Sequence, residues 1–438
     1  MENNLSIVIL AAGKGSRMKS DTPKVLHEIA NKSMLLHVID NSKKLKPKNI
    51  YVVLGKKSDD VKNTLPKNIK VIIQDEQLGT GHALLCAKNI LTKAKGKLLV
   101  LYGDVPLVES KTLKKLIKKD AKNISMLGFN TSSPKGYGRI KVKNYKVSEV
   151  IEEKNLMGKD SKIKTCYSGI FCGNTKLIFS LLTDIKKSKS HNEYLLTDIF
   201  ILACKKNISI SLSITTESEV MGVNNLYQLS LAEEYFQNKL RKNFLLNGVL
   251  FKDPKTVYFS FDTKIGAKSK IDINNNFGKN VIIKSNVLIK SNNDIESSTI
   301  SEGANIGPFS RLRNNAIIGK NAKIGNFVEI KNSTIGNNTK VNHLTYIGDS
   351  IIGSNTNIGA GTITCNFDGK NKNRTLIGDN VFIGSNCALI APIKIGSKSF
   401  VAAGSTISDN LNTDDFSIAR AKQKIIKAGS KRFLKRRK

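Results

Sequence analysis

The second half of this 438-residue chain places an aliphatic or aromatic residue at every sixth position, and this period constrains the fold more than any other feature. The longest runs extend over residues 265–295, 300–330 and 377–407, and shorter runs cover 335–347 and 352–358. A glycine often follows, as at Ile306-Gly307 and Ile318-Gly319. A six-residue repeat of this length is typical of a parallel β-helix, in which aliphatic side chains stack inward and a small residue allows each corner. Such a coil can carry a binding site, or it can serve only as an assembly scaffold.

The first half of the chain alternates short β-branched runs with helical stretches. Residues 6–11, 50–54, 69–74 and 97–102 are expected to form strands, with helices after Ser33, Ser58, Thr80 and Ser110. This alternation predicts βαβ units and a largely parallel sheet. Apolar residues at helical spacing between 224 and 246 predict a linker helix. We therefore expect an α/β domain at 1–224, a linker helix at 225–247, and a β-helix domain at 248–438 that ends in a basic tail.

The charge of the chain is strongly positive, with 71 Lys and Arg against 35 Asp and Glu. The cations are spread along the whole sequence and cluster densely only at the C-terminus. Aromatic residues make up 6% of the chain and Trp is absent, so platforms for stacking nucleic-acid bases are not expected. The charge is therefore expected to favour small anionic substrates rather than a specific nucleic acid.

The cellular setting follows from cysteine usage and from the first residues. The six cysteines have neither paired nor ligand-like spacing, which argues against a disulfide framework and against a zinc site. The segment from Met1 to Ser6 lacks a basic region, and the apolar stretch after it is too short for a signal sequence or a membrane span. We expect a cytoplasmic protein without a membrane span.

A loop of small residues follows the first expected strand and is a candidate nucleotide-binding loop. It runs through residues 10–18 and is followed by Pro23-Lys24, so small residues stand beside cations. Small residues let backbone N–H groups approach a nucleotide, and the cations can neutralise its phosphates. The loop matches neither a Walker motif nor GxGxxG. Asp104, expected at the carboxyl end of another strand, is a candidate Mg²⁺ ligand beside the phosphates, although a turn-capping role is common for such an Asp.

Two cations in the β-helix predict a second site. Arg313 and Lys331 each follow an inward aliphatic residue and lie 18 residues apart, which is three hexapeptides. If three hexapeptides make one coil, the two side chains stack at a strand spacing of about 4.8 Å. Like charges at that distance favour an anion between them, although two solvated surface cations are the alternative. His343 stands two positions after Val341, where a side chain can face outward, and an imidazole there can act as a general base.

Both halves, in this order, resemble the sugar-nucleotide pyrophosphorylase family, and specifically the bifunctional N-acetylglucosamine-1-phosphate uridyltransferase/glucosamine-1-phosphate acetyltransferases. The resemblance extends from about residue 5 to about residue 420. It implies an α/β nucleotidyltransferase domain with a Rossmann-like mixed sheet, followed by a left-handed parallel β-helix. It also implies a homotrimer, with Mg²⁺ as cofactor and UTP, acetyl-CoA and glucosamine 1-phosphate as substrates. The product would be UDP-N-acetylglucosamine, used in cell-wall synthesis.

By this resemblance the first domain has a nucleotide and sugar site. The residues implied there are Leu10, Ala11, Ala12, Gly13, Lys24, Gln74, Gly79, Thr80, Tyr102, Gly103, Asp104, Gly138, Glu152 and Asn224. Arg17 and Lys24 would stabilise the triphosphate, and Asp104 and Asn224 would hold Mg²⁺. The chain departs from the family at Tyr167-Ser168-Gly169, where the family has Asn-Thr-Gly, so we assign no role to Tyr167.

The resemblance also gives roles to residues of the β-helix. His343 would be the catalytic base, and we expect Glu329 to orient it. The sugar phosphate would bind Arg313, Lys331, Tyr346, Asn357 and Lys372. Acetyl-CoA would contact Ala360, Asn366, Phe367, Ser385, Ala403 and Arg420, with Asn366 a candidate donor to the oxyanion. Phe367 stands where the family has Tyr, which removes a polar contact. The alternative is a nucleotidyltransferase that acts alone, with the β-helix as a trimerisation scaffold.

Overall fold

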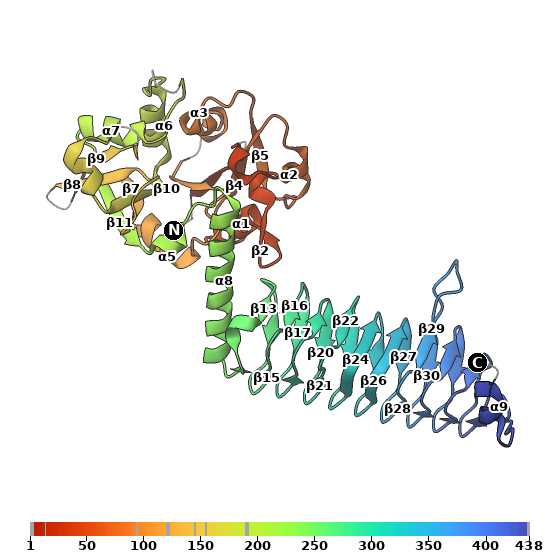
Figure 1. Cartoon of the computed structure of the whole chain (residues 1–438). Coiled ribbons are helices and arrows are strands. Elements are labelled where there is room, and N and C mark those ends of the chain that lie inside the picture. Colours follow the sequence, from red (N-terminus) through yellow and green to blue (C-terminus); the bar gives the residue numbers. More distant parts are fainter. Residues whose placement is uncertain are drawn as a thin grey trace. The chain divides into compact units, whose positions relative to one another are not determined.

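The structure is a computed structural model that describes residues 4–13, 15–92, 95–119, 123–143, 146–153, 156–188 and 192–435. Lys14 of the small-residue loop and Arg436, Arg437 and Lys438 of the basic tail lie outside these ranges. The chain divides into two compact units, residues 1–236 and 237–438, and the division falls within helix α8 (Leu226–Leu246) (Figure 1). Within the described ranges, no helix combines the length and apolar character needed to cross a membrane.

The first unit is built around a nine-stranded mixed sheet. Seven strands follow one another across it in the order β11-β7-β10-β6-β1-β4-β5, and β8 and β9 form a hairpin beside β10. Their bounds are β1 (Leu5–Leu10), β4 (Asn49–Gly55), β5 (Lys70–Gln74), β6 (Lys97–Tyr102), β7 (Ile124–Asn130), β8 (Arg139–Lys143), β9 (Lys146–Ile151), β10 (Thr165–Asn174) and β11 (Ile210–Thr215). Strands β5, β4, β1 and β6 are parallel, whereas β10 is antiparallel to both its neighbours β6 and β7. The expected strands are confirmed, within a sheet that is mixed.

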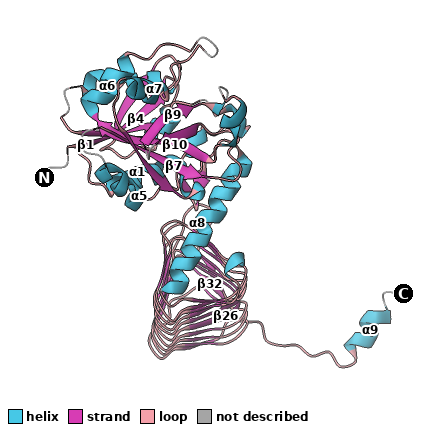
Figure 2. Cartoon of the chain, turned by 90° about the vertical axis from the view of Figure 1, so that its left-hand side faces the viewer, coloured by secondary structure: helices cyan, strands magenta, loops and turns pink. Residues whose placement is uncertain are grey.

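Helices cover both faces of this sheet, with α6 and α7 on one side and α1 and α5 on the other (Figure 2). Alternate residues of β1 serve the two cores, since Val8 and Leu10 pack with α6 and α7 while Ile7 and Ile9 pack with α1 and α5. The helices are α1 (Met34–Lys43), α2 (Asp59–Asn63), α3 (Thr80–Leu85), α4 (Lys88–Leu91), α5 (Ser110–Lys119), α6 (Thr175–Thr183) and α7 (Asp198–Lys205). A short hairpin, β2 (Glu28–Ile29) and β3 (Lys32–Ser33), precedes α1, and the Ser33 hydroxyl accepts from Leu36 N at its start.

The second unit is a parallel β-helix whose strands form three ladders, and α9 (Gly429–Lys435) follows it. The first ladder contains β12 (Leu250–Phe251), β15 (Lys270–Ile271), β18 (Leu288–Ile289), β21 (Asn305–Ile306), β24 (Lys323–Lys331), β26 (Lys340–Gly348), β28 (Asn357–Ile358), β31 (Phe382–Ile383), β34 (Phe400–Val401) and β36 (Phe416–Ser417). The second contains β13 (Tyr258–Phe259), β16 (Asn276–Phe277), β19 (Asp294–Ile295), β22 (Arg311–Arg313), the long strands β24 and β26, β29 (Ile363–Cys365), β32 (Ala388–Ile390) and β35 (Thr406–Ile407). The third contains β14 (Lys264–Ile265), β17 (Val281–Ile283), β20 (Ser298–Ile300), β23 (Ala316–Ile318), β25 (Thr334–Ile335), β27 (Ser350–Ile352), β30 (Thr375–Ile377) and β33 (Ile393–Ile395).

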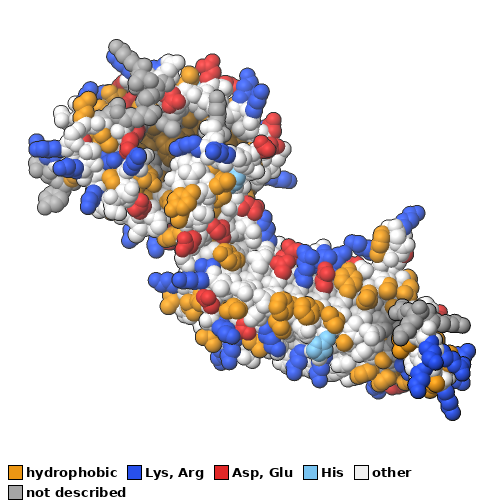
Figure 3. Space-filling model, viewed as in Figure 1, with side chains coloured by type: hydrophobic (Ala, Val, Ile, Leu, Met, Phe, Trp, Pro, Cys, Tyr) orange, Lys and Arg blue, Asp and Glu red, His pale blue; other side chains and the backbone are white. Residues whose placement is uncertain are grey.

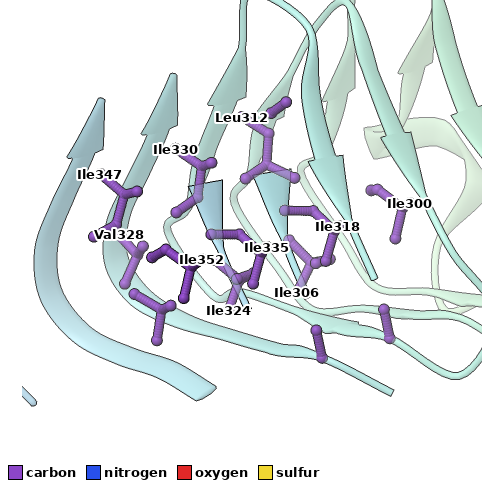
Figure 4. Packing of buried hydrophobic residues seen from close by; sticks show 14 of the residues in the cluster. Ile300, Ile306, Leu312, Ile318, Ile324, Val328, Ile330, Ile335, Ile347 and Ile352 are labelled. Carbon is purple, nitrogen blue, oxygen red and sulfur yellow. The ribbon is translucent and has the colours of Figure 1, made fainter. Parts of the chain in front are cut away.

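The residues that recur at every sixth position form the inward face of this coil. Its aliphatic positions form one continuous core, and the side chains of Ile306, Ile324 and Ile330 point into the interior (Figure 4). The glycine after an inward residue is needed for space, because a Cβ on Gly319 would lie 2.6 Å from the carbonyl carbon of Gly336 on the next coil. The left-handed corner positions are taken mainly by asparagine, such as Asn338 and Asn355.

Candidate active sites

A cavity of about 590 Å³ opens in the first unit, where several parallel strands end. The loop after β1, the end of β5 and the residues after β6 meet there, together with the start of α3. Ligands of α/β sheets bind at this edge because the loops after the strands converge on it. Of the expected residues, the cavity is lined by Leu10, Ala11, Ala12, Gly13, Arg17, Lys24, Gln74, Gly79, Thr80, Tyr102, Asp104 and Asn224.

The Lys24 side chain contacts both expected metal ligands, Asp104 and Asn224. Its ammonium forms an ion pair with the Asp104 carboxylate and donates to Asn224 Oδ1 at 2.7 Å. Arg17 Nη2 donates to the same Asn224 oxygen at 2.9 Å. Asp104 and Asn224, 120 positions apart in the sequence, therefore direct oxygen atoms at one point that a cation occupies. Carboxylate and amide oxygens suit Mg²⁺, so this pair fits that ion.

The small-residue loop needs glycine where it meets Lys24. Gly15 has a φ of 67°, in the left-handed region, and a Cβ there would lie 2.6 Å from Lys24 Cβ. Any other residue at position 15 would therefore strain the backbone and push Lys24 away from the loop. This contact explains why the Gly-x-Gly turn and Lys24 belong to the same site.

Three expected residues do not line this cavity. Gly103 N donates to Leu10 O at 2.9 Å, so this glycine packs behind the loop. Glu152 accepts from Thr197 Oγ1 at 2.6 Å and lines a separate cavity of about 210 Å³. Gly138 lies next to Glu152, since a Cβ on Gly138 would be 3.9 Å from Glu152 Oε2. The structure thus places Gly138 and Glu152 together but apart from the lining of the larger cavity.

Sequence reasoning missed Gln77 and Glu193, which also line the larger cavity. Gln77 Nε2 donates to Ala12 O at 2.6 Å and so holds the loop after β1. A Cβ added to Gly79 would lie 3.0 Å from the Cβ of Glu193, so Glu193 lies beside the start of α3. Gln77 lies in the Gln74–Gly79 stretch already singled out, whereas nothing in the sequence links Glu193 to this site.

Tyr167, where the chain departs from the family pattern, faces the core. Its hydroxyl donates to Gly169 O at 2.9 Å, and its ring packs edge-on against Phe200 with centroids 5.1 Å apart. Burial, followed by the nearby Tyr102 and Glu152, raises the pKa of the Tyr167 phenol well above its usual value. The side chain is therefore a neutral core residue.

The second unit brings the expected cations together. Arg313 and Lys331 are direct partners in the register of β22 and β24. Lys372, from the loop that leaves the coil after β29 (Figure 1), contacts Lys331, and this contact, followed by burial, lowers the pKa of the Lys331 ammonium. Arg313 Nε also donates to Glu329 Oε1 at 2.6 Å. Clustered cations of this kind can bind an anion, because an anion relieves their mutual repulsion.

His343 is exposed on β26, as expected, but its partner is not Glu329. The ring nitrogen Nδ1 lies 2.7 Å from Asn326 Oδ1 on β24. The expectation that Glu329 orients His343 is wrong, because the register pairs His343 with Asn326, whereas Glu329 pairs with Tyr346 beyond the corners at Phe327 and Leu344. Glu329 is instead the partner of Arg313.

Tyr346 and Asn366 meet beside Gly348, and Asn366 also bonds the neighbouring Asp349. Asn366 Nδ2 donates to Asp349 Oδ2 at 2.5 Å, and Asn332 Nδ2 donates to Asp349 Oδ1 at 2.5 Å. Burial raises the pKa of Asp349, but the two amide donors and the nearby Lys331 and Lys372 outweigh it, so the pKa is lowered. One N–H of Asn366 is thus used within the protein, and only the other is available to an oxyanion. Sequence reasoning missed Asp349.

Residues expected to contact acetyl-CoA lie on successive coil corners. Asn386 N donates to Ala360 O at 2.7 Å, and Gly404 N donates to Ser385 O at 2.8 Å. Arg420 Nη1 reaches the next corner and donates to Ala403 O at 2.6 Å.

The two remaining expected residues are Asn357 and Phe367. Asn357 pairs in register with Lys340, on the ladder that does not include Arg313. Phe367 is 60% exposed at the base of the loop.

Comparison with known proteins agrees with both units. The MobA-like NTP transferase domain matches residues 7–132, the GMPPB C-terminal domain matches 294–367, and the bacterial transferase hexapeptide (six repeats) matches 374–409. The bifunctional protein GlmU of Zymomonas mobilis is 43% identical over 99% of this chain and 98% of its own length. The bifunctional protein GlmU of Wolbachia pipientis is 43% identical over 95% of this chain and 97% of its own length. That of Clostridium beijerinckii is 40% identical over 96% of this chain and 96% of its own length. The chain therefore belongs to the bifunctional GlmU family and is an enzyme with uridyltransferase and acetyltransferase activities.

Proposed function

We propose that the chain converts glucosamine 1-phosphate into UDP-N-acetylglucosamine in two steps. In the β-helix, the substrate amine attacks the thioester carbon of acetyl-CoA, the carbon–sulfur bond breaks, and coenzyme A leaves as N-acetylglucosamine 1-phosphate forms. In the first unit, a phosphate oxygen of that product attacks the α-phosphorus of UTP in line, and pyrophosphate leaves. We assign the uridylyl step to residues 1–224, a linker to 225–247, and the acetyl step to 248–438.

The cavity at the strand ends supports the uridylyl step. Backbone groups of residues 10–13 and the start of α3 at Thr80 would contact the nucleotide. Arg17 and Lys24 would neutralise the triphosphate, so that catalysis comes from positioning and charge. Asp104 and Asn224 would hold Mg²⁺, which when bound supplies further charge neutralisation beside the phosphates. The convergence of these two oxygens on one cation is the observation that carries this half of the proposal.

The cation cluster of the coil supports the acetyl step. Arg313, Lys331 and Lys372 would bind the phosphate of glucosamine 1-phosphate, because their mutual repulsion is relieved by a dianion. His343 would take the proton from the attacking amine, and the free N–H of Asn366 would stabilise the oxyanion. The corners at Ala360, Ser385 and Ala403, together with Arg420, would contact acetyl-CoA.

The assembly and setting are part of the same proposal. Hexapeptide coils commonly associate, and the outer face of this coil exposes the stacked rings of Phe382, Phe400 and Phe416. We assign the chain to a cytoplasmic homotrimer. Apart from a cluster at the C-terminal end, its Lys and Arg side chains are scattered over the visible surface, which favours small anionic substrates over a nucleic acid (Figure 3).

Two variants of the full chain test the proposal. His343→Ala should abolish acetyl transfer to glucosamine 1-phosphate and leave the uridylyl reaction with N-acetylglucosamine 1-phosphate intact. Asp104→Asn should do the reverse. Acetyl transfer that survives His343→Ala would overturn the role of His343 as the base. An unmodified chain that lacks acetyl transfer would favour the alternative in which the β-helix is only a scaffold.

A further inference from the structure

We infer that Asn326 is a positioning residue for His343, whose ring it holds in the tautomer that leaves Nε2 free to accept a proton. This inference rests on the proposed role of His343 as the base of acetyl transfer. It assigns a task to a residue that the sequence pattern did not single out.

The geometry places the two side chains directly opposite each other. Asn326 on β24 and His343 on β26 are Cα partners, and Oδ1 of the amide lies 2.7 Å from Nδ1 of the ring. The strands run very close here, since a Cβ on Gly325 would lie 2.6 Å from the carbonyl carbon of Asn342. The next residues, Phe327 and Leu344, are both in the left-handed region, so both chains turn at the same place. The pair is therefore held by the shape of the coil.

The chemistry of the contact fixes the tautomer. An amide oxygen only accepts hydrogen bonds, so the ring nitrogen facing it must carry the proton. A neutral imidazole has one N–H, and its other nitrogen, Nε2, then has a free lone pair. An exposed imidazole without such a partner rotates and exchanges its proton with water, so only part of its population would present a proton acceptor to the substrate.

Other amides of the coil show what is unusual about this pair. Asn338 donates to Asn355 at 3.0 Å, and Asn274 donates to Asn292 at 3.1 Å, each bond joining successive coils. At Asn326 the same kind of coil-to-coil contact ends on an imidazole instead of a second amide. A neutral amide orients the ring without the charge of a carboxylate, which would favour the protonated imidazole and so lower the neutral fraction that can accept a proton.

The test compares three variants in the full chain, with the uridylyl reaction of the same protein as internal control. Asn326→Ala should lower kcat for acetyl transfer by about 10- to 100-fold, with a smaller change in KM for glucosamine 1-phosphate. Asn326→Asp keeps an acceptor and should recover activity at high pH, with the acid limb of its pH–rate profile moved to higher pH. Asn338→Ala removes a comparable amide contact outside the site and should leave both activities unchanged.

Several outcomes would overturn the inference. Wild-type acetyl transfer in Asn326→Ala would show that the ring needs no such partner. An equal loss in Asn326→Ala and Asn326→Asp, with an unshifted pH profile, would mean that only packing was disturbed. Neither result bears on the proposed role of His343 as the base, which fails separately if His343→Ala retains acetyl transfer, or on the proposed function, which fails if the unmodified chain does not acetylate glucosamine 1-phosphate.

Discussion

Gly348 lies where Tyr346 and Asn366 meet, and replacing it with alanine should disable one activity of the chain. A Cβ at this position would lie 2.7 Å from Tyr346 Cζ and 2.8 Å from Asn366 Nδ2. Carbon atoms in ordinary contact are about 3.5 Å apart, so one of these groups must move by about 0.8 Å. A misplacement of about 1 Å in an active site costs about 10²-fold in rate. We therefore expect Gly348→Ala to lower kcat/KM for acetyl transfer by about that factor, while the overpacking costs about 1–3 kcal/mol of stability.

The assay measures release of the coenzyme A thiol and uridylyl transfer on the same preparation. Uridylyl transfer should remain at the wild-type rate, because Gly348 lies in the β-helix unit. Ile335→Val is the control for stability alone, since this core side chain faces the coil interior and its truncation costs about 1 kcal/mol. Acetyl transfer by Gly348→Ala within twofold of wild type would refute the argument that Tyr346 and Asn366 must keep their places.

Removal of Mg²⁺ with EDTA should stop the uridylyl step and leave acetyl transfer at its full rate, because Asp104 lies only in the first site; equal loss of both activities would contradict this separation. Burial lowers the pKa of His37 to about 4 from the usual 6.5, despite the opposing hydrogen bond with Ile29 O. The unfolded chain binds a proton on His37 below about pH 6.5, whereas the folded chain binds it only below about pH 4. The free energy of unfolding should therefore fall by about 3 kcal/mol between these two pH values, and His37 should have no effect on it above this range. Urea unfolding between pH 7.5 and 4 should show this loss in the wild type and in the exposed-site control His343→Gln, but not in His37→Gln; an unchanged pH dependence in His37→Gln would contradict the assignment.

Most of the fold could be predicted because its patterns are local. The six-residue period identified inward residues such as Ile306 and Ile330 directly, since each coil repeats the same three short strands. The cations Arg313 and Lys331 were placed correctly because a coil of 18 residues separates them. In the first unit, the loop after β1 and Asp104 after β6 converge because parallel strands end at one edge of the sheet.

The partners of individual side chains could not be predicted because small changes in coil length alter the register. The coil after Asn326 has 17 residues rather than 18, which brings His343 opposite Asn326 instead of Gly325. Glu329 contacts Arg313 on the preceding coil. Glu193 was missed because only the packing of residues far apart in sequence brings it to α3. The role of Asp349 depends on two amide donors that lie 17 residues from it in opposite directions.

A coupled assay on the purified chain, with glucosamine 1-phosphate, acetyl-CoA and UTP each left out in turn, measures the two activities together. UDP-N-acetylglucosamine should form only when all three are present, and N-acetylglucosamine 1-phosphate should replace the first two. If the chain uses N-acetylglucosamine 1-phosphate but never acetylates glucosamine 1-phosphate, the β-helix is a scaffold and the second active site does not exist.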